Sequence, residues 1–266
     1  MFRLTREVRF AINDAPDDQI GSKPTNSYAG YPSLTGLGYF FRVQVTLAGE
    51  LDPRTSYLLN IKQVDEHVRN VGVPLVSRAI HREAFGGGGK VVHDLFEELR
   101  YVWPPHVHLH DLRLALSPFL AIEVHATEFP MVRLSQKFEF AASHRLHCPT
   151  MSDAENVRTF GKCNNPHGHG HNYELQVTLR GVPHTNGVLM DVPDMERLVA
   201  EHVIDRFDHK NLNVELDEFR GVVPSVENIA KVIYEILEPK FGEAGATLAS
   251  VTVWETPKTW CEYTGD

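Results

Sequence analysis

The sequence predicts an α+β protein made of two similar units, each an antiparallel sheet with helices on one face. Three observations predict this: an internal repeat, runs of alternating β-branched residues, and an apolar stripe at helical spacing. The repeat matches residues 35–49 to residues 167–181 at a constant offset of 132, with seven of fifteen positions identical. We therefore expect one unit over residues 1–130 and a second over residues 131–266, with the seam near Pro130.

The expected elements follow the chain in the same order in both units: strand, loop, strand, two helices and two strands. Strands are expected where β-branched side chains alternate with others, as in ELQVTL (174–179) and SVTVWE (250–255). The second helix of the second unit should begin at Ser225, which follows Pro224 and can cap the first turn. Its apolar residues recur at helical spacing and provide one face for the sheet. These residues are Ile229, Val232, Ile233, Ile236 and Leu237.

Composition excludes several classes of protein. Apolar residues make up 42% and charged residues 23%, which is typical of a globular protein and not of a disordered chain. The net charge of −9 and the absence of a basic tail argue against a nucleic-acid partner. No apolar run approaches the ~20 residues of a membrane helix, and the N-terminus lacks the apolar segment of a signal peptide. The 3 cysteines are too few for a disulfide framework and favour a reducing, cytoplasmic location.

Three histidines of the second unit form a candidate metal site. His169 and His171 alternate at the start of an expected strand, so both imidazoles lie on one face, and His144 ends the preceding strand. Three imidazoles leave one tetrahedral position open, as in catalytic zinc sites, although other divalent ions also accept this ligand set. The first unit provides an internal control, because its matching positions have lost the imidazoles. These positions are Asp14, Leu37 and Tyr39.

Further candidate residues accompany the histidines. Cys163 precedes the HGH pair by six residues. A thiolate beside a metal can act as base or nucleophile, or as a fourth ligand. Asp208 and His209 are adjacent, as in proton relays where a carboxylate orients an imidazole. Glu255 lies on an expected strand as either a surface charge or a ligand anchor, and its apolar counterpart Leu116 favours the anchor.

Taken together, the motifs of the second unit resemble those of the 6-pyruvoyl-tetrahydropterin synthase family. The resemblance covers nearly all of residues 131–266 and implies the tunnelling fold, or T-fold, in which sheets of several subunits close into a barrel. Under this resemblance the first unit is a degenerate T-fold copy without zinc or catalytic residues. The motifs, in the order and approximate spacing of the family, are FAASHRLH (140–147), FGKCNNPHGHGHNY (160–173), GVLMD (187–191), DHKNLN (208–213), PSVENIA (224–230) and VWET (253–256).

The resemblance also implies a role for each matching residue. Cys163 would be the general base, and Glu255 would anchor the amino-pyrimidine edge of a pterin by paired hydrogen bonds. Asp208 and His209 would form a relay supplied across a subunit interface. The residues that would bind Zn²⁺ are His144, His169 and His171. The cations near the motifs that could hold a triphosphate are Lys137, Arg145, Lys162 and Lys210.

The implied reaction converts 7,8-dihydroneopterin triphosphate to 6-pyruvoyl-tetrahydropterin, with loss of triphosphate. Two alternatives stay open: the 6-carboxy-tetrahydropterin synthase reaction of queuosine biosynthesis, which releases acetaldehyde, and a pterin-binding protein without catalysis. The GKCNNP segment favours the pyruvoyl-forming type. Since the family barrel consists of two stacked trimers of single units, a tandem chain is expected to form a homotrimer.

Overall fold

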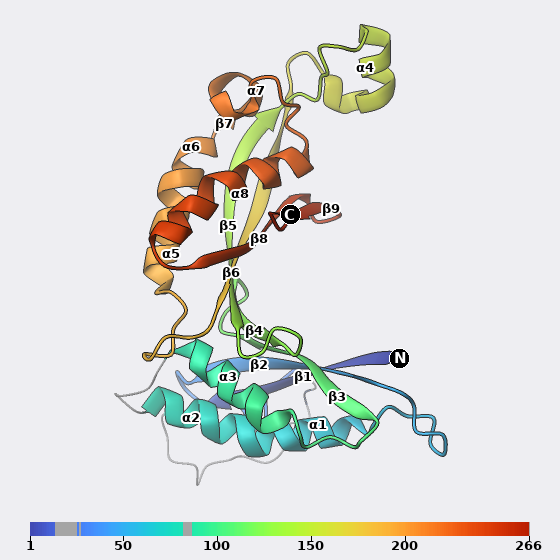
Figure 1. Cartoon of the computed structure of the whole chain (residues 1–266), viewed down its shortest axis with the longest axis vertical. Helices are drawn as coiled ribbons and strands as arrows, with labels where there is room; N and C mark the ends of the chain where they lie inside the picture. The colour runs from blue at the N-terminus through green and yellow to red at the C-terminus, as the bar shows by residue number, and fades with distance from the viewer. Residues whose placement is uncertain (14–25, 27, 82–86, 266) are drawn as a thin grey trace. The chain divides into compact units, whose positions relative to one another are not determined.

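The computed structural model describes residues 1–13, 26, 28–81 and 87–265 (Figure 1). It confirms the α+β class, because antiparallel strands carry helices on one face. The chain divides into two compact units, which are described separately. Unit 1 comprises Met1–Leu134 with Gly181–Leu189, and unit 2 comprises Ser135–Arg180 with Met190–Asp266. Asp14, the position matched to His144, lies outside the described residues.

Unit 1 is an antiparallel sheet in the order β1–β2–β3–β4. Strand alternation sets its two faces: Val8 and Phe10 are fully buried, whereas Glu7 and Arg9 lie on the opposite face. The helices contribute the rest of the apolar core, including Val92 and Leu95. The elements of unit 1 are β1 (Phe2–Ile12), β2 (Tyr39–Gly49), α1 (Ile61–His67), the π-helical segment η2 (Val68–Gly72), α2 (Val73–His81), α3 (Gly88–Leu99), β3 (Val107–Ala115) and β4 (Leu120–His125).

Unit 2 has the strand order β5–β6–β8–β9, and the short strand β7 pairs in parallel with the end of β5. Its first group of elements comprises β5 (Val132–His144), α4 (Asp153–Phe160), the 3₁₀ segment η3 (Gly161–Asn164), β6 (His169–Gly181), α5 (Val192–Val199), the π-helical segment η4 (Ala200–Ile204) and α6 (Asp205–Phe207). The second group comprises β7 (Lys210–Asn211), α7 (Leu212–Glu215), the 3₁₀ segment η5 (Asp217–Phe219), α8 (Val226–Glu243), β8 (Thr247–Thr256) and β9 (Thr259–Tyr263).

Helix α8 packs on β8 and begins where the sequence predicts. The hydroxyl of Ser225 accepts a hydrogen bond from the backbone N–H of Asn228 at 3.4 Å, which confirms Ser225 as the N-cap. Ile229 and Ile233 on the predicted stripe are fully buried, and Ile236 at its margin is half-buried. The helix is therefore held by its apolar face, and its first residue is fixed by a local hydrogen bond.

Units 1 and 2 share two irregularities at matching positions. A β-bulge follows Thr46 in β2 and Thr178 in β6, at the repeat offset of 132. The π-helical segments η2 and η4 start and end at positions separated by the same offset. Cross-strand hydroxyl pairs also match, because Thr5 meets Thr46 at 2.9 Å and Ser135 meets Thr178 at 3.1 Å.

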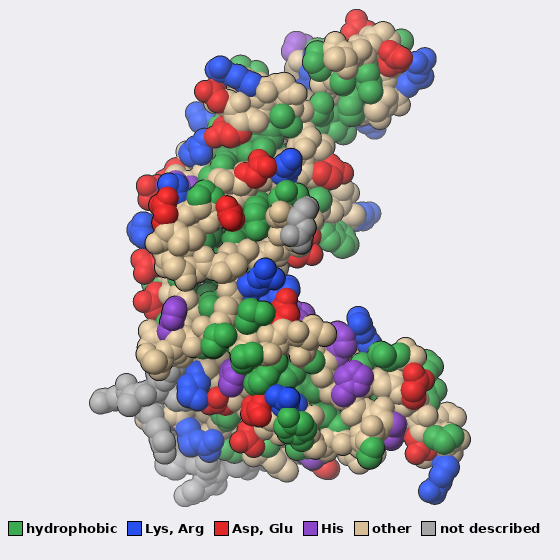
Figure 2. Space-filling model, viewed as in Figure 1, with side chains coloured by type: hydrophobic (Ala, Val, Ile, Leu, Met, Phe, Trp, Pro, Cys, Tyr) green, Lys and Arg blue, Asp and Glu red, His purple; other side chains and the backbone are tan. Residues whose placement is uncertain are grey.

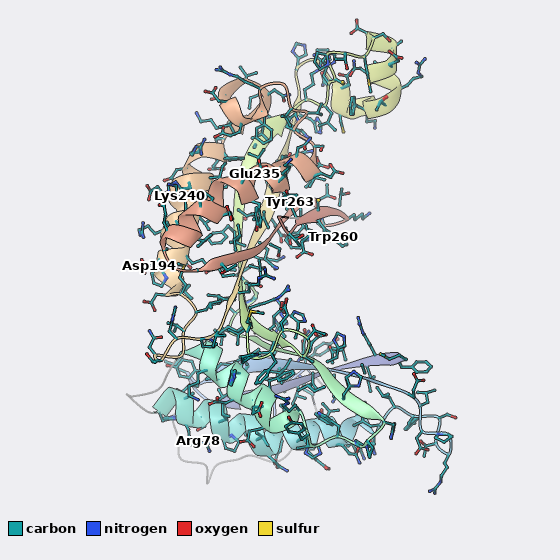
Figure 3. The ribbon with its side chains drawn as sticks, in the orientation of Figure 1. Arg78, Asp194, Glu235, Lys240, Trp260 and Tyr263 are labelled. Carbon is teal, nitrogen blue, oxygen red and sulfur yellow. The ribbon has the colours of Figure 1, made fainter. Side chains whose placement is uncertain are left out.

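Strand β9 forms the outer edge of the sheet of unit 2. Its Trp260 pairs with Trp254 of β8, is 57% exposed and projects from the strand (Figure 3). On the visible face of unit 2, acidic and basic side chains are interspersed with apolar ones (Figure 2). Within the described residues, no helix combines the length and the apolar character needed to cross a bilayer.

Candidate metal centre and active site

The three candidate ligands continue the apolar rows of two neighbouring strands. On β6, His169 and His171 precede the buried Tyr173 and Leu175 at alternating positions, so all four side chains share one face. On β5, the fully buried His144 follows Phe140 and Ala142 in the same way. Strand alternation thus brings the imidazoles to one end of the buried face.

The structure places the three imidazoles in one cluster. One ring nitrogen from each of His144, His169 and His171 can be chosen so that all lie within 4.8 Å of one another. The Nε2 atoms of His144 and His169 are 3.2 Å apart. Two nitrogens bound to one zinc ion at about 2.0–2.1 Å with tetrahedral angles lie about 3.4 Å apart. The observed separation therefore fits two ligands of a single cation.

Hydrogen bonding and burial leave ring nitrogens of these imidazoles available to a cation. His144 Nδ1 lies 2.7 Å from the carbonyl oxygen of Pro224 and donates to it, which leaves the lone pair on Nε2. Burial lowers the pKa of His144 despite this carbonyl, and nearby His169 lowers it further. His169 Nδ1 and His171 Nε2 are buried without a hydrogen-bond partner in the described part of the chain. Neutral imidazoles with facing nitrogens are the donor set that a divalent cation requires.

Glu255 lies against the same cluster. Its Oε1 atom is 3.3 Å from His144 Nε2 and 3.5 Å from His171 Nε2, and its side chain is 19% exposed. A ligand held by this carboxylate would consequently lie beside the three imidazoles. The same distances would allow Glu255 to approach a bound cation.

Cys163 and Tyr173 complete the neighbourhood of the cluster. The carbonyl of Cys163 accepts a hydrogen bond from Leu146 N at 2.8 Å, which ties η3 to the chain that follows His144. The hydroxyl of Tyr173 is 3.3 Å from His144 Nδ1. Burial strongly raises the pKa of Tyr173, and the negative charges of Glu255 and Cys163 raise it further. Sequence reasoning assigned Tyr173 no role, although its place in the alternation after HGH could have indicated one.

Asp208 and His209 form a hydrogen-bonded pair in a different place. Asp208 accepts from Ala141 N through Oδ1 and from His209 Nδ1 through Oδ2, each at 2.8 Å. These two hydrogen bonds lower the pKa of Asp208. The hydrogen bond through Nδ1 leaves His209 Nε2 directed away from Asp208, on a side chain that is 82% exposed. In the described residues, no hydrogen bond joins this pair to Cys163.

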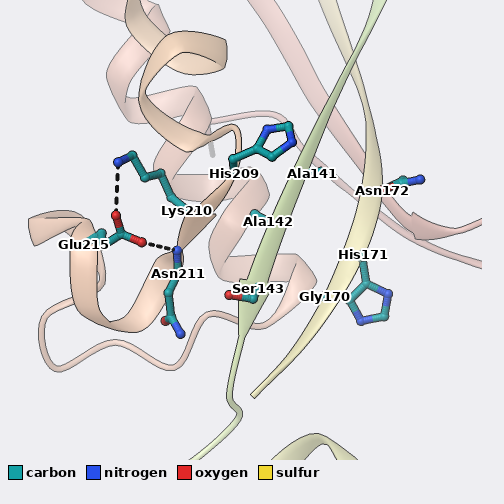
Figure 4. A pocket seen from close by; sticks show the side chains of 10 residues that line it. All are labelled: Ala141, Ala142, Ser143, Gly170, His171, Asn172, His209, Lys210, Asn211 and Glu215. Atoms are coloured by element: carbon teal, nitrogen blue, oxygen red, sulfur yellow. Dashed lines mark hydrogen bonds and ion pairs between the residues drawn. The ribbon is translucent and has the colours of Figure 1, made fainter. Parts of the chain in front are cut away.

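An open cavity of about 550 Å³ lies beside the Asp208–His209 pair and includes His171 in its wall. Figure 4 shows that the rings of His209 and His171 do not meet. Unit 2 thus brings the imidazole cluster and Glu255 into contact, whereas within the described residues no hydrogen bond or ion pair joins the predicted relay to them.

A second cavity, of about 690 Å³, opens beside the cluster and is lined by both His169 and Lys162. The four cations that the sequence suggests for a triphosphate differ in their partners. Lys137 and Lys210 form ion pairs with glutamates at 2.7 and 3.0 Å, and Arg145 Nε donates to Asn164. Lys162 has no ion pair within the described part of the chain, so its ammonium group is available to a ligand in this cavity.

The matching positions of unit 1 carry no comparable cluster. Leu37 is 99% exposed and Tyr39 is also exposed. Over the described ranges, the histidines of unit 2 are the one group of three or more ligating side chains close enough for a metal.

Residues 133–266, which contain the imidazole cluster and Glu255, are similar to a known protein family. The family model for 6-pyruvoyl tetrahydropterin synthase matches residues 133–266. The 6-pyruvoyl tetrahydrobiopterin synthase of Homo sapiens is 39% identical over 135 residues, which cover 50% of this chain and 92% of the human protein. That of Drosophila melanogaster is 36% identical over 137 residues, with coverages of 51% and 81%. The solved Caenorhabditis elegans 6-pyruvoyl tetrahydropterin synthase is 39% identical, with a TM-score of 0.49 and coverages of 52% and 97%.

Proposed function

Because the chain belongs to the 6-pyruvoyl tetrahydropterin synthase family through residues 133–266, we propose that unit 2 is a zinc-dependent 6-pyruvoyl-tetrahydropterin synthase. Its substrate would be 7,8-dihydroneopterin triphosphate, and triphosphate would be eliminated. The observation that carries this proposal is the cluster of three imidazoles whose ring nitrogens lie close together. The pyruvoyl product is favoured because the human and fly relatives bear that name.

Each candidate residue of unit 2 has a separate role in this proposed reaction. Zinc held by the three histidines would supply positive charge to oxygen atoms of the substrate side chain. Glu255 accepts hydrogen bonds from the amino-pyrimidine edge of the pterin and holds the ring beside the histidine cluster. Cys163 removes a proton from the side chain of the bound pterin. Lys162 faces the triphosphate from the cavity that it shares with His169.

We further propose that unit 1 is a degenerate T-fold copy and that the chain assembles as a homotrimer. The shared bulges and π-helical segments support the first proposal. The second is supported by Asp208 and His209, which are hydrogen-bonded to each other and, within the described residues, not to Cys163. A neighbouring chain would bring its Asp208–His209 pair to Cys163 as the proton relay.

One assay tests the proposal. Zinc-loaded protein is incubated with 7,8-dihydroneopterin triphosphate, and the pterin product is identified by mass spectrometry. We expect 6-pyruvoyl-tetrahydropterin from the unaltered protein. Cys163→Ala should reduce turnover by about a hundredfold or more, because it removes the general base, yet it should keep its zinc. Cys261→Ala on β9 is the matched control and should keep full activity.

The other outcomes are informative. A 6-carboxy pterin with acetaldehyde would replace the pyruvoyl assignment with the queuosine-type reaction and leave the site residues in place. Pterin binding of equal strength in the unaltered protein and Cys163→Ala, without turnover in either, would overturn the enzyme proposal in favour of a binding protein.

A further inference from the structure

The sheet of unit 1 carries a small polar cavity on the face opposite its helices. The cavity measures about 160 Å³, which is enough for a small oxyanion. It lies over β1, β2 and β3 and reaches the turn that follows β3. The lining residues are Glu7, Arg42, Gln44, Arg113, Ala115, Ser117 and Pro118.

Positive charge exceeds negative charge around this cavity. Glu7 is already occupied, because it accepts from Arg9 at 2.6 Å and from Gln44 at 3.2 Å. Arg113 contacts one further carboxylate, Glu123, at 3.2 Å. The cavity wall itself therefore carries two guanidinium groups, those of Arg42 and Arg113, and one carboxylate, that of Glu7. Arg42 lies directly opposite Arg9 across β1 and β2, and the Glu7 carboxylate attracts both guanidinium groups.

Several hydrogen-bond donors of the cavity wall remain unused. Arg42 makes no hydrogen bond or ion pair within the described residues, so all five N–H donors of its guanidinium are available. Ser117 Oγ accepts from the backbone N–H groups of Phe119 and Leu120, each at 3.0 Å, which leaves its own O–H free to donate. Gln44 uses one of its two amide hydrogens on Glu7 and retains the other.

Unit 2 provides an internal comparison. In the first strand the two units match at an offset of 130, as Asp14 matches His144, so Glu7 corresponds to Lys137; Arg42 corresponds to Glu174 at the offset of 132. In unit 2 the charges are reversed and the two side chains form an ion pair at 2.7 Å. Gln44 faces Arg113 across β2 and β3, whereas the matching Gln176 faces the uncharged Thr252. The excess of guanidinium groups is therefore specific to unit 1 and is not required by the fold.

We propose that this cavity is a binding site for a tetrahedral oxyanion, either free phosphate or the terminal phosphate of a larger metabolite. Donors from Arg42, Arg113, Gln44 and Ser117 surround one space, and the guanidinium fork pairs well with phosphate oxygens. More than two donor groups suit a tetrahedral anion better than a planar carboxylate. The site is separate from the imidazole cluster and does not depend on the activity proposed for unit 2.

The test is titration calorimetry of the full chain with inorganic phosphate, at constant ionic strength. Saturable binding is expected in the unaltered protein. Arg42→Gln removes the unpaired charge while keeping a hydrogen-bonding side chain, and it should weaken binding by about tenfold or more. Arg54→Gln removes an equal charge from an exposed turn outside the cavity and should leave binding unchanged. Tighter binding of tripolyphosphate than of phosphate would identify the end of a longer phosphate chain as the ligand.

Melting temperature separates a binding role from a structural one. Phosphate should raise the melting temperature of the unaltered protein. Without phosphate, Arg42→Gln should melt close to the unaltered protein, because Arg42 makes no hydrogen bond or ion pair within the described residues. A lower melting temperature in Arg42→Gln, with phosphate binding as tight as in the unaltered protein, would overturn the proposal. Acetate that binds as tightly as phosphate would also contradict a tetrahedral site.

Discussion

His144 joins the core of unit 2 to its candidate metal site. Its Nδ1 donates to the carbonyl of Pro224, just before α8, and its Nε2 faces His169. The residue is fully buried, so its ring cannot turn without breaking the first contact. The start of α8 thereby sets which nitrogen of His144 is available to a cation.

A second single residue, Lys162, is predicted to bind the triphosphate of the substrate. Lys162→Ala should raise KM for the triphosphate substrate by about tenfold and change kcat less, because an exposed ammonium group contributes mainly to ground-state binding. Steady-state kinetics at low and high salt measure this effect, and the loss should shrink as salt screens the charge. Lys210→Ala is the control, since its ammonium is already paired with Glu215 at 3.0 Å. Equal KM values for the unaltered protein and Lys162→Ala would contradict the assignment.

Among the elements, the β3–β4 hairpin is predicted to make the stability of unit 1 depend on pH. His125 lies 3.5 Å from Glu123 and 2.5 Å from Asp111, and these carboxylates raise its pKa above the ordinary value of 6.5 despite partial burial. A raised pKa in the folded state means that protonated His125 stabilises the fold. This contribution is complete below pH 6.5 and is lost as pH rises through the folded-state pKa.

Urea unfolding of the unaltered protein and of His125→Gln at pH 5.5, 6.5 and 8 tests whether protonated His125 stabilises the fold. The difference in stability between the two should be largest at about pH 5.5 and should diminish toward about pH 8. His108→Gln, on the exposed face of β3, should show no such trend. A difference that grows with rising pH would refute the interpretation.

The sequence predicts the elements well because their signals are local. Alternation in β6 places His169 and His171 on one face, and the cap at Ser225 sets the start of α8. The contacts that complete the site depend on tertiary structure instead. No spacing in the sequence indicates that the carbonyl of Pro224 meets His144 or that Asp208 binds the backbone of Ala141. These contacts bridge residues that are 80 and 67 positions apart along the chain.

For the whole molecule, the lack of any hydrogen bond between the Asp208–His209 pair and Cys163 within the described residues predicts that activity requires assembly. Light scattering during size-exclusion chromatography should give a mass of three times 30.0 kDa. Trp260→Lys places a charge on the outer edge strand β9, where unpaired backbone groups are available to another chain. It should therefore reduce both the oligomer mass and turnover. Tyr101→Lys replaces an exposed aromatic residue of unit 1 and should change neither. A monomer with full turnover would show that one chain contains the complete site.

The paired π-helical segments η2 and η4 bear on the history of the chain. A π-helical turn contains one residue more than the α-helix needs, as a single-codon insertion would produce. If the two units descend from one ancestral sequence, a single insertion inherited by both explains two such turns at the same offset of 132. That insertion is then older than the duplication, and the ancestral single unit would already have carried the π-helical turn.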